Sequence, residues 1–160
     1  MKALFITLKE LKRKSIFDGN LDSDKIIQFI EVAQDTEIQQ YLGTKLYDKI
    51  QADIIADTLT GDYLTLVNDY LKPMLTWYTQ ATYIPYAAYQ ISNGGIYKHN
   101  SENATTPELS EINALHHHAN ETAEFYTQRF LDYMNYNSHL YPEYIENQND
   151  GMYPERDVNF

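Results

Sequence analysis

Apolar side chains recur three and four positions apart along most of this chain, which is the spacing of one face of an α-helix. The clearest example follows the polar residues 22–24, where Ile26, Phe29, Ile30 and Ala33 share one face. The pattern predicts helices over residues 7–14, 22–42, 45–57, 62–91 and 107–137.

Residues that start or bend helices agree with these bounds. Thr7 and Glu10 form the Thr-x-x-Glu pattern of a capping box at the start of the first helix. Thr106 is suited to the N-cap of the last helix, with Pro107 at its first position. Pro85 should bend the fourth helix, because proline has no backbone N–H to donate to the carbonyl four residues earlier.

Two segments lack a helical stripe. Residues 92–106 are rich in Gly, Asn, Ser and Thr, which predicts a long exposed loop containing at most a short hairpin. Residues 138–160 contain Tyr-Pro-Glu twice, and we expect them to form an extended C-terminal arm after a helical domain of residues 1–137. The predicted fold class is therefore all-α: a helical bundle of four to five helices with a long exposed loop and an extended C-terminal arm.

Composition narrows the class of protein further. A chain of 160 residues has the length of one domain, and the absence of cysteine excludes disulfides, cysteine zinc sites and thiol nucleophiles. No segment approaches the ~20 apolar residues of a membrane span, and the N-terminal residues lack the apolar run of a signal peptide. We expect a soluble, unsecreted protein that does not contact a membrane.

Charge is distributed unevenly along the chain, whose net charge is −11. Residues 1–14 carry five basic side chains against Glu10, whereas residues 99–160 carry eleven carboxylates against Arg129 and Arg156. Lys and Arg supply most of the affinity for phosphate backbones, so a chain this acidic is poorly suited to grip nucleic acid. An acidic surface instead repels DNA.

The residues that most resemble a chemical site are three adjacent histidines, His116, His117 and His118. Successive helical residues point ~100° apart, so the three cannot converge on one ion, and only His116 lies on the apolar stripe. His117 and Glu121 stand at i and i+4, and leave open a metal-dependent hydrolase. With no further ligand on a helix, we predict no catalytic, metal or cofactor site and expect that the protein is not an enzyme.

Two groups of residues are candidates for an interface. The first is the basic run of the first helix, for which a solvated surface is the alternative. The second is the set of apolar and aromatic residues of the tail, which would either dock on another subunit or fold back on their own domain. The candidate interface residues are Lys12, Arg13, Lys14, Leu140, Tyr141, Tyr144, Ile145, Met152, Tyr153 and Phe160.

Residues 6–50 resemble the N-terminal pattern of the small all-helical head-to-tail connector (adaptor) proteins of tailed bacteriophages. In that pattern a Thr-Leu-x-Glu-x-Lys helix is followed by an Asp-rich turn, a helix of the type I-x-x-[FL]-I-x-x-A and a Y-x-G stop. The matching residues are Thr7, Leu8, Glu10, Lys12, Asp22, Asp24, Ile27, Ile30, Ala33, Tyr41, Gly43 and Leu46.

The resemblance implies a structural virion protein at the neck of the particle, present in the host cytoplasm before assembly. It implies a homo-oligomeric ring, commonly of twelve subunits, that binds the portal protein and tail or neck proteins and lets DNA pass without specific binding. The alternative from the sequence is a cytosolic helical interaction adaptor whose arm docks on a partner.

Overall fold

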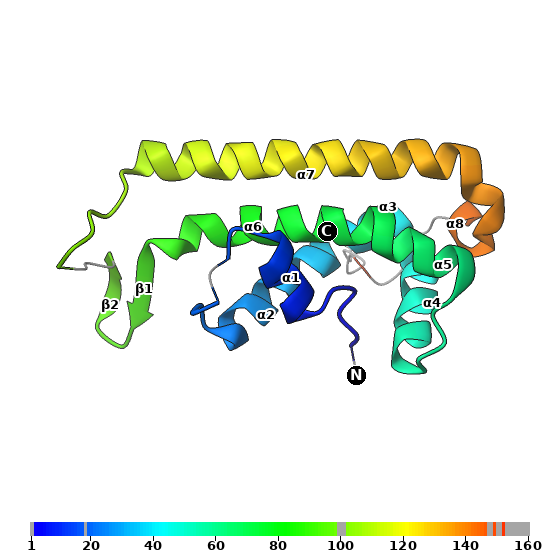
Figure 1. The fold of residues 1–160 in the computed structure, drawn as a ribbon, viewed down its shortest axis with the longest axis horizontal. Coiled ribbons are helices and arrows are strands. Elements are labelled where there is room, and N and C mark those ends of the chain that lie inside the picture. The colour runs from blue at the N-terminus through cyan, green and yellow to red at the C-terminus, as the bar shows by residue number, and fades with distance from the viewer. Residues whose placement is uncertain (1, 18, 99–101, 147–148, 150–151, 153–160) are drawn as a thin grey trace, which may run out of the picture.

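In a computed structural model that describes residues 2–17, 19–98, 102–146, 149 and 152, the chain is mostly helical and forms three layers (Figure 1). Helix α6 (Lys72–Ala87) runs through the middle. The long helix α7 (Leu109–Asn137) lies antiparallel along one side of it, and α1 (Leu8–Lys14), α2 (Ser23–Ala33) and α4 (Thr44–Ile55) lie on the other. The remaining elements are the π-helical turn Gln34–Ile38, α3 (Gln39–Leu42), α5 (Gly61–Thr65), the π-helical turn Leu66–Leu71, β1 (Tyr89–Ser92), β2 (Gly95–Lys98), the 3-10 turn Ser138–Leu140 and α8 (Pro142–Ile145).

Helix α6 is buried on two sides, which explains its composition. Apolar side chains such as Met74 and Leu75 are fully buried in the core. The hydroxyls of Thr76 and Thr79 are buried as well, and each donates to the carbonyl four residues earlier, at 2.8 and 2.6 Å. Polar side chains on a helix that is buried on two sides must find hydrogen-bond partners within the protein. The two threonine hydroxyls find them on the backbone of α6 itself.

The π-helical turn before α6 has a local cause. Pro73 has no N–H for the carbonyl of Asp69 and its ring would collide with that carbonyl, so the preceding turn widens to π geometry. The other turn begins at Gln34, whose side chain is fully buried. There the wider turn interrupts the predicted helix 22–42 without ending it.

Two buried glutamines hold the N-terminal segment against the bundle. Gln34 accepts a hydrogen bond from the backbone N–H of Phe5 and donates to the carbonyl of Ala3, at 2.7 and 2.9 Å. Gln51 makes the same pair of bonds with both backbone groups of Ala3, at 2.6 and 2.7 Å. Side-chain amides thus replace a neighbouring strand, and Phe5 and Ile6 enter the core.

Most predicted helices are confirmed, and two predicted ends are wrong. The helix expected over 62–91 stops at Ala87, because the chain turns back at Asn93 and Gly94 and pairs β1 with β2. The last helix begins after Glu108 instead of Thr106, since Glu108 and Glu111 form a reciprocal capping box there.

The prediction that an extended arm begins at residue 138 is also wrong. Ser138–Leu140 and α8 turn back along the bundle, so this part of the tail follows the alternative of packing on its own domain. Tyr141 is fully buried, and its hydroxyl donates to the carbonyl of Asp62 at 2.9 Å while lying 2.8 Å from the Tyr133 hydroxyl. The helical domain therefore extends to at least Glu146.

We predict that Tyr141→Ala lowers the free energy of unfolding by about 3 kcal/mol or more, because it empties a fully enclosed aromatic site. Tyr141→Phe should cost about 1 kcal/mol through the lost hydrogen bonds. Urea titrations followed by circular dichroism measure both. Ile145→Ala, at a side chain 68% exposed on the adjoining helix, is the control and should change stability by less than about 0.5 kcal/mol. Equal effects at positions 141 and 145 would contradict the burial of Tyr141.

Candidate functional site

The candidate interface residues Lys12, Arg13 and Lys14 lie together on α1, but they differ in exposure and in hydrogen bonding. The ammonium group of Lys12 donates to the carbonyls of Gly19 and Leu21, at 3.3 and 3.2 Å, and so braces the turn after α1. Arg13 and Lys14 occupy the last turn of the helix and are exposed. The part of the basic run that is available to a partner is therefore Arg13 and Lys14.

An ion pair ties this basic helix to the central one. Glu10 of α1 accepts a hydrogen bond from Lys72 of α6 at 2.7 Å and completes the capping box with Thr7. Burial acts to raise the pKa of Glu10, but the hydrogen bonds from Lys72 and Thr7 outweigh it and lower that pKa to about 2. The carboxylate stays charged and holds the orientation of α1.

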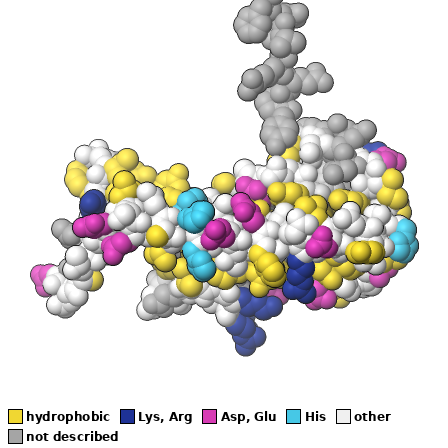
Figure 2. Space-filling model, turned by 90° about the horizontal axis from the view of Figure 1, so that it is seen from above, with side chains coloured by type: hydrophobic (Ala, Val, Ile, Leu, Met, Phe, Trp, Pro, Cys, Tyr) yellow, Lys and Arg dark blue, Asp and Glu magenta, His cyan; other side chains and the backbone are white. Residues whose placement is uncertain are grey.

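The opposite layer carries the acidic surface. Helix α7 has four carboxylates, at Glu111, Glu121, Glu124 and Asp132, against the single basic side chain of Arg129. Seen from the α7 side, acidic and histidine side chains lie along this face, and basic side chains gather mainly toward one edge (Figure 2). The described part of the molecule thus presents a basic helix on one layer and an acidic helix on the other.

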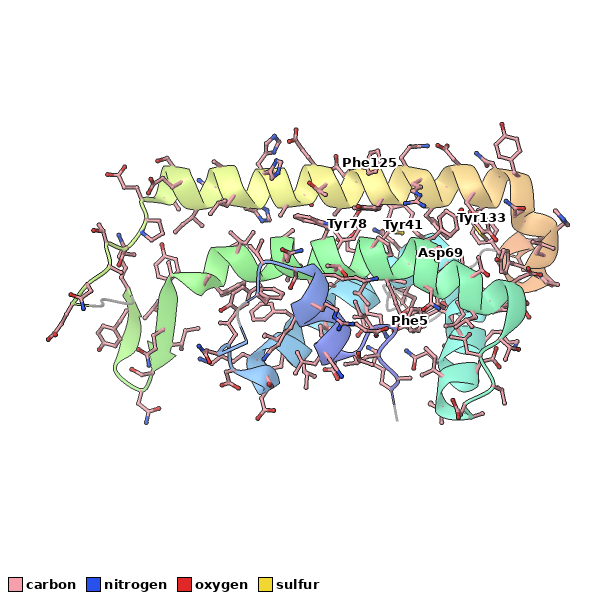
Figure 3. The ribbon with its side chains drawn as sticks, viewed as in Figure 1. Phe5, Tyr41, Asp69, Tyr78, Phe125 and Tyr133 are labelled. Carbon is pink, nitrogen blue, oxygen red and sulfur yellow. The ribbon has the colours of Figure 1, made fainter. Side chains whose placement is uncertain are left out.

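Helix α7 also exposes large apolar side chains. Tyr78 and Tyr133 point into the space between α6 and α7, whereas Phe125 points away from it (Figure 3). The Tyr78 hydroxyl lies 2.9 Å from that of Thr127, and the ring of Tyr133 stacks on Tyr70 at 4.0 Å between centroids. Phe125 is 64% exposed and Tyr136, further along the helix, 83%. The inner face of α7 packs against α6, and its outer face leaves Phe125 and Tyr136 exposed to solvent.

The histidines fall into one structural residue and two exposed ones. His116 is half-buried, and its Nδ1 lies 2.7 Å from the carbonyl oxygen of Ala81. Pro85 stands four residues after Ala81 and has no N–H to offer that carbonyl, so His116 donates in its place. This hydrogen bond gives a structural reason for a histidine at position 116, which lies on the apolar stripe of α7.

His117 and Glu121 form an exposed pair, with His117 Nε2 3.2 Å from Glu121 Oε1. Within the ranges described, no three His, Cys, Asp or Glu side chains are grouped so that they could hold a metal ion. Of the residues considered for a hydrolase, the structure therefore brings together this pair and no third ligand within those ranges.

The candidate residues of the tail do not form one exposed surface. Tyr141 is enclosed, Leu140 and Tyr144 are partly buried against the core, and Ile145 is exposed. Met152 is partly buried and lines a small polar depression beside Lys2, Asp35 and Tyr47. Tyr153 and Phe160 lie outside the described residues.

The sequence allowed a short hairpin within residues 92–106, but it assigned residues 88–91 to a helix and did not indicate how exposed the β1–β2 hairpin is. All eight strand residues are exposed, including Ile91 at 72% and Ile96 at 70%. Tyr89 pairs with Lys98 and Ile91 with Ile96, so these four side chains share one face of the hairpin. The available signal was the Asn93–Gly94 dipeptide between two short β-prone runs.

The fold defines a class, an all-α helical bundle with a small two-stranded hairpin. Over residues 38–151, more than half of its length, the chain matches a family described as a family of unknown function, DUF6712, and it belongs to that family. No curated protein and no solved structure matches it. Among the helices described, none combines the length and the apolar character needed to cross a bilayer.

We predict that His116→Ala lowers stability by about 1–2 kcal/mol, because the Ala81 carbonyl loses the donor that replaces the proline. His117→Ala and His118→Ala, on the exposed side of the same turn, should change stability by less than about 0.5 kcal/mol. Thermal and urea unfolding of the three variants measures this difference. Stoichiometric metal in protein purified without a histidine tag would contradict the structural role.

The Glu10–Lys72 pair predicts a pH dependence. The pKa of Glu10 is lower in the folded chain than its ordinary value of 4.5, so the ionised group stabilises the fold above pH 4.5, and this contribution disappears as the pH falls toward 2. Glu10→Gln should therefore be less stable than the wild type at pH 6, and the difference should vanish near pH 2. Since Glu10 is 40% exposed, we expect less than about 1 kcal/mol. A difference that grows on acidification would contradict this assignment.

Proposed function

We propose that this chain is a structural head-to-tail connector protein of a tailed bacteriophage, which forms an oligomeric ring between the portal and the tail. The observation that carries the proposal is the opposite charge of two helices in different layers: α1 presents Arg13 and Lys14, and α7 presents its carboxylates. In a ring each subunit contacts its neighbours through two different surfaces, and complementary charge on those surfaces favours head-to-tail contact.

The acidic composition supports the second part of the proposal, that DNA passes through the ring. A net charge of −11 repels a phosphate backbone. The proposed partners are other copies of this chain, the portal protein, and tail or neck proteins, with the virion neck as the location. The resemblance of residues 6–50 to the connector pattern supports the same assignment, and it includes Glu10 and Lys12, which orient and brace α1.

Part of the predicted arm is retained in this proposal. Residues 138–146 pack on their own bundle, so the segment offered to a neighbour starts after Glu146. Met152, Tyr153 and Phe160 remain candidate anchors of that segment, while Tyr141 is reassigned to the core.

The alternative function is a helical interaction adaptor outside the virion. The exposed Phe125 and the exposed hairpin favour an interaction protein of either kind. The genomic neighbourhood separates the two: genes for portal, terminase and major capsid protein beside this one support the connector, and a metabolic operon contradicts it.

For the ring, we predict that Arg13→Glu combined with Lys14→Glu abolishes assembly and leaves the helical content unchanged, because both side chains are exposed. Light scattering and negative-stain microscopy, with and without portal protein, measure the mass and shape of the assemblies. Lys25→Glu, at an exposed position on α2, is the matched control and should assemble normally. Rings that form equally well from the double variant would show that the basic helix is not part of the interface.

A further inference from the structure

The end of the molecule that bears the hairpin also carries an open apolar groove with a volume of about 600 Å³. It lies between the turn after α1, the last turn of α6, and the loop and first turns of α7. Its lining includes Ile16, Leu21, Ala87, Pro107, Ile112 and Leu115. Ile16 and Leu115 are 68% and 55% exposed, so the described residues leave this groove open.

The chemistry of the groove favours an aliphatic occupant. Small-molecule sites usually add several convergent polar groups to an apolar lining. Here nine of the fourteen lining residues are aliphatic, Phe17 and Tyr83 add aromatic rings, and the remaining three are Asn20, Thr105 and Thr106. The groove suits a small apolar surface better than a polar metabolite.

The hairpin provides such a surface and is itself incomplete. A two-stranded hairpin alone is marginally stable, and Ile91 and Ile96 lie side by side on one face with most of their surface in water. Burying both side chains would stabilise the hairpin and remove apolar surface from solvent. Its strands have four residues each and carry Lys98 at one end, features that disfavour pairing with another strand edge.

Charge indicates how the two surfaces meet. Lys98 shares the hairpin face with Ile91 and Ile96. Three exposed carboxylates are sequence neighbours of groove-lining residues: Glu108 follows Pro107, Glu111 precedes Ile112, and Asp22 follows Leu21. An apolar face with one cation at its end therefore complements an apolar groove bordered by carboxylates.

We propose that the hairpin of one copy docks in the groove of a second copy, with Ile91 and Ile96 in the groove and Lys98 at its acidic border. The inference rests on the proposed function for the identity of the partner, another copy of this chain. A protrusion on one subunit that fills a groove on the next can repeat from copy to copy, and such a series of identical contacts forms a ring when the rotation between subunits closes.

The test uses the absence of cysteine from the native sequence. Full-length Ile96→Cys protein is mixed with full-length Leu115→Cys protein under mild oxidation. We expect a mixed disulfide-linked dimer that forms at least tenfold faster than the dimer from Ile96→Cys with Phe125→Cys. Phe125 is the matched control because it is exposed on the same helix outside the groove. Equal rates, or a product made mainly of Ile96→Cys paired with itself, would overturn the docking.

A second experiment separates this proposal from the ring. The double variant Ile96→Cys/Leu115→Cys should give a ladder of covalent multimers if docking builds a ring. Closed covalent dimers would uphold the docking and count against the ring. Ring-sized particles in light scattering without the mixed disulfide would uphold the ring and overturn the docking.

A non-covalent measurement guards against artefacts of oxidation. Ile91→Ser with Ile96→Ser should weaken self-association at least tenfold while circular dichroism stays unchanged, because neither side chain belongs to the core. Tyr97→Ser, on the other face of the hairpin, should leave self-association within twofold of the wild type. Equal weakening by both changes would overturn the assigned face.

Discussion

The burial of α6 on two sides is the constraint on which the rest of the structure depends. Its buried side chains are covered by α7 on one side and by α2 with the N-terminal segment on the other. Neither of these layers alone would bury all of them. A helix enclosed in this way must also satisfy its own polar groups internally. The threonine hydroxyls do so within α6, and His116 does so from α7 at the carbonyl that Pro85 leaves without its usual donor.

That constraint also explains why the surfaces are so unequal. Since α6 occupies the middle, α1 and α7 lie in different layers, and their charges cannot neutralise one another within the chain. The outer face of α7 and the hairpin have no further layer of described residues over them, and they keep Phe125, Tyr136 and two isoleucines in contact with water. Exposed apolar groups at this density are usual where another protein surface covers them.

The sequence predicted the helices because each buries a regular stripe, and the periodicity of a stripe is a local property. The capping box at Thr7 and Glu10 is equally local and is confirmed. The prediction failed for residues 88–91 for a different reason: their apolar spacing suits a helix, but α6 ends at Ala87 and the turn that follows pairs Tyr89, Gln90 and Ile91 as a strand. Whether such a segment becomes a helix or a strand depends on whether a partner strand is available, and the spacing of apolar residues does not reveal that.

The sequence could predict the role of a residue only where that role depends on its position along its own helix. The exposed basic end of α1 and the exclusion of a convergent histidine cluster follow from positions along a single helix. Gln34, Gln51 and Tyr141 act through contacts with backbone groups 29 to 79 residues away, so nothing near them in sequence distinguishes them from surface residues. The same holds for His116, whose role depends on a proline 31 positions earlier in another helix. A histidine on the apolar stripe of α7 thus corresponds to a carbonyl of α6 that lacks its usual backbone donor. Pro85 marks that carbonyl in the sequence, and the two can be matched once α6 and α7 are known to pack together.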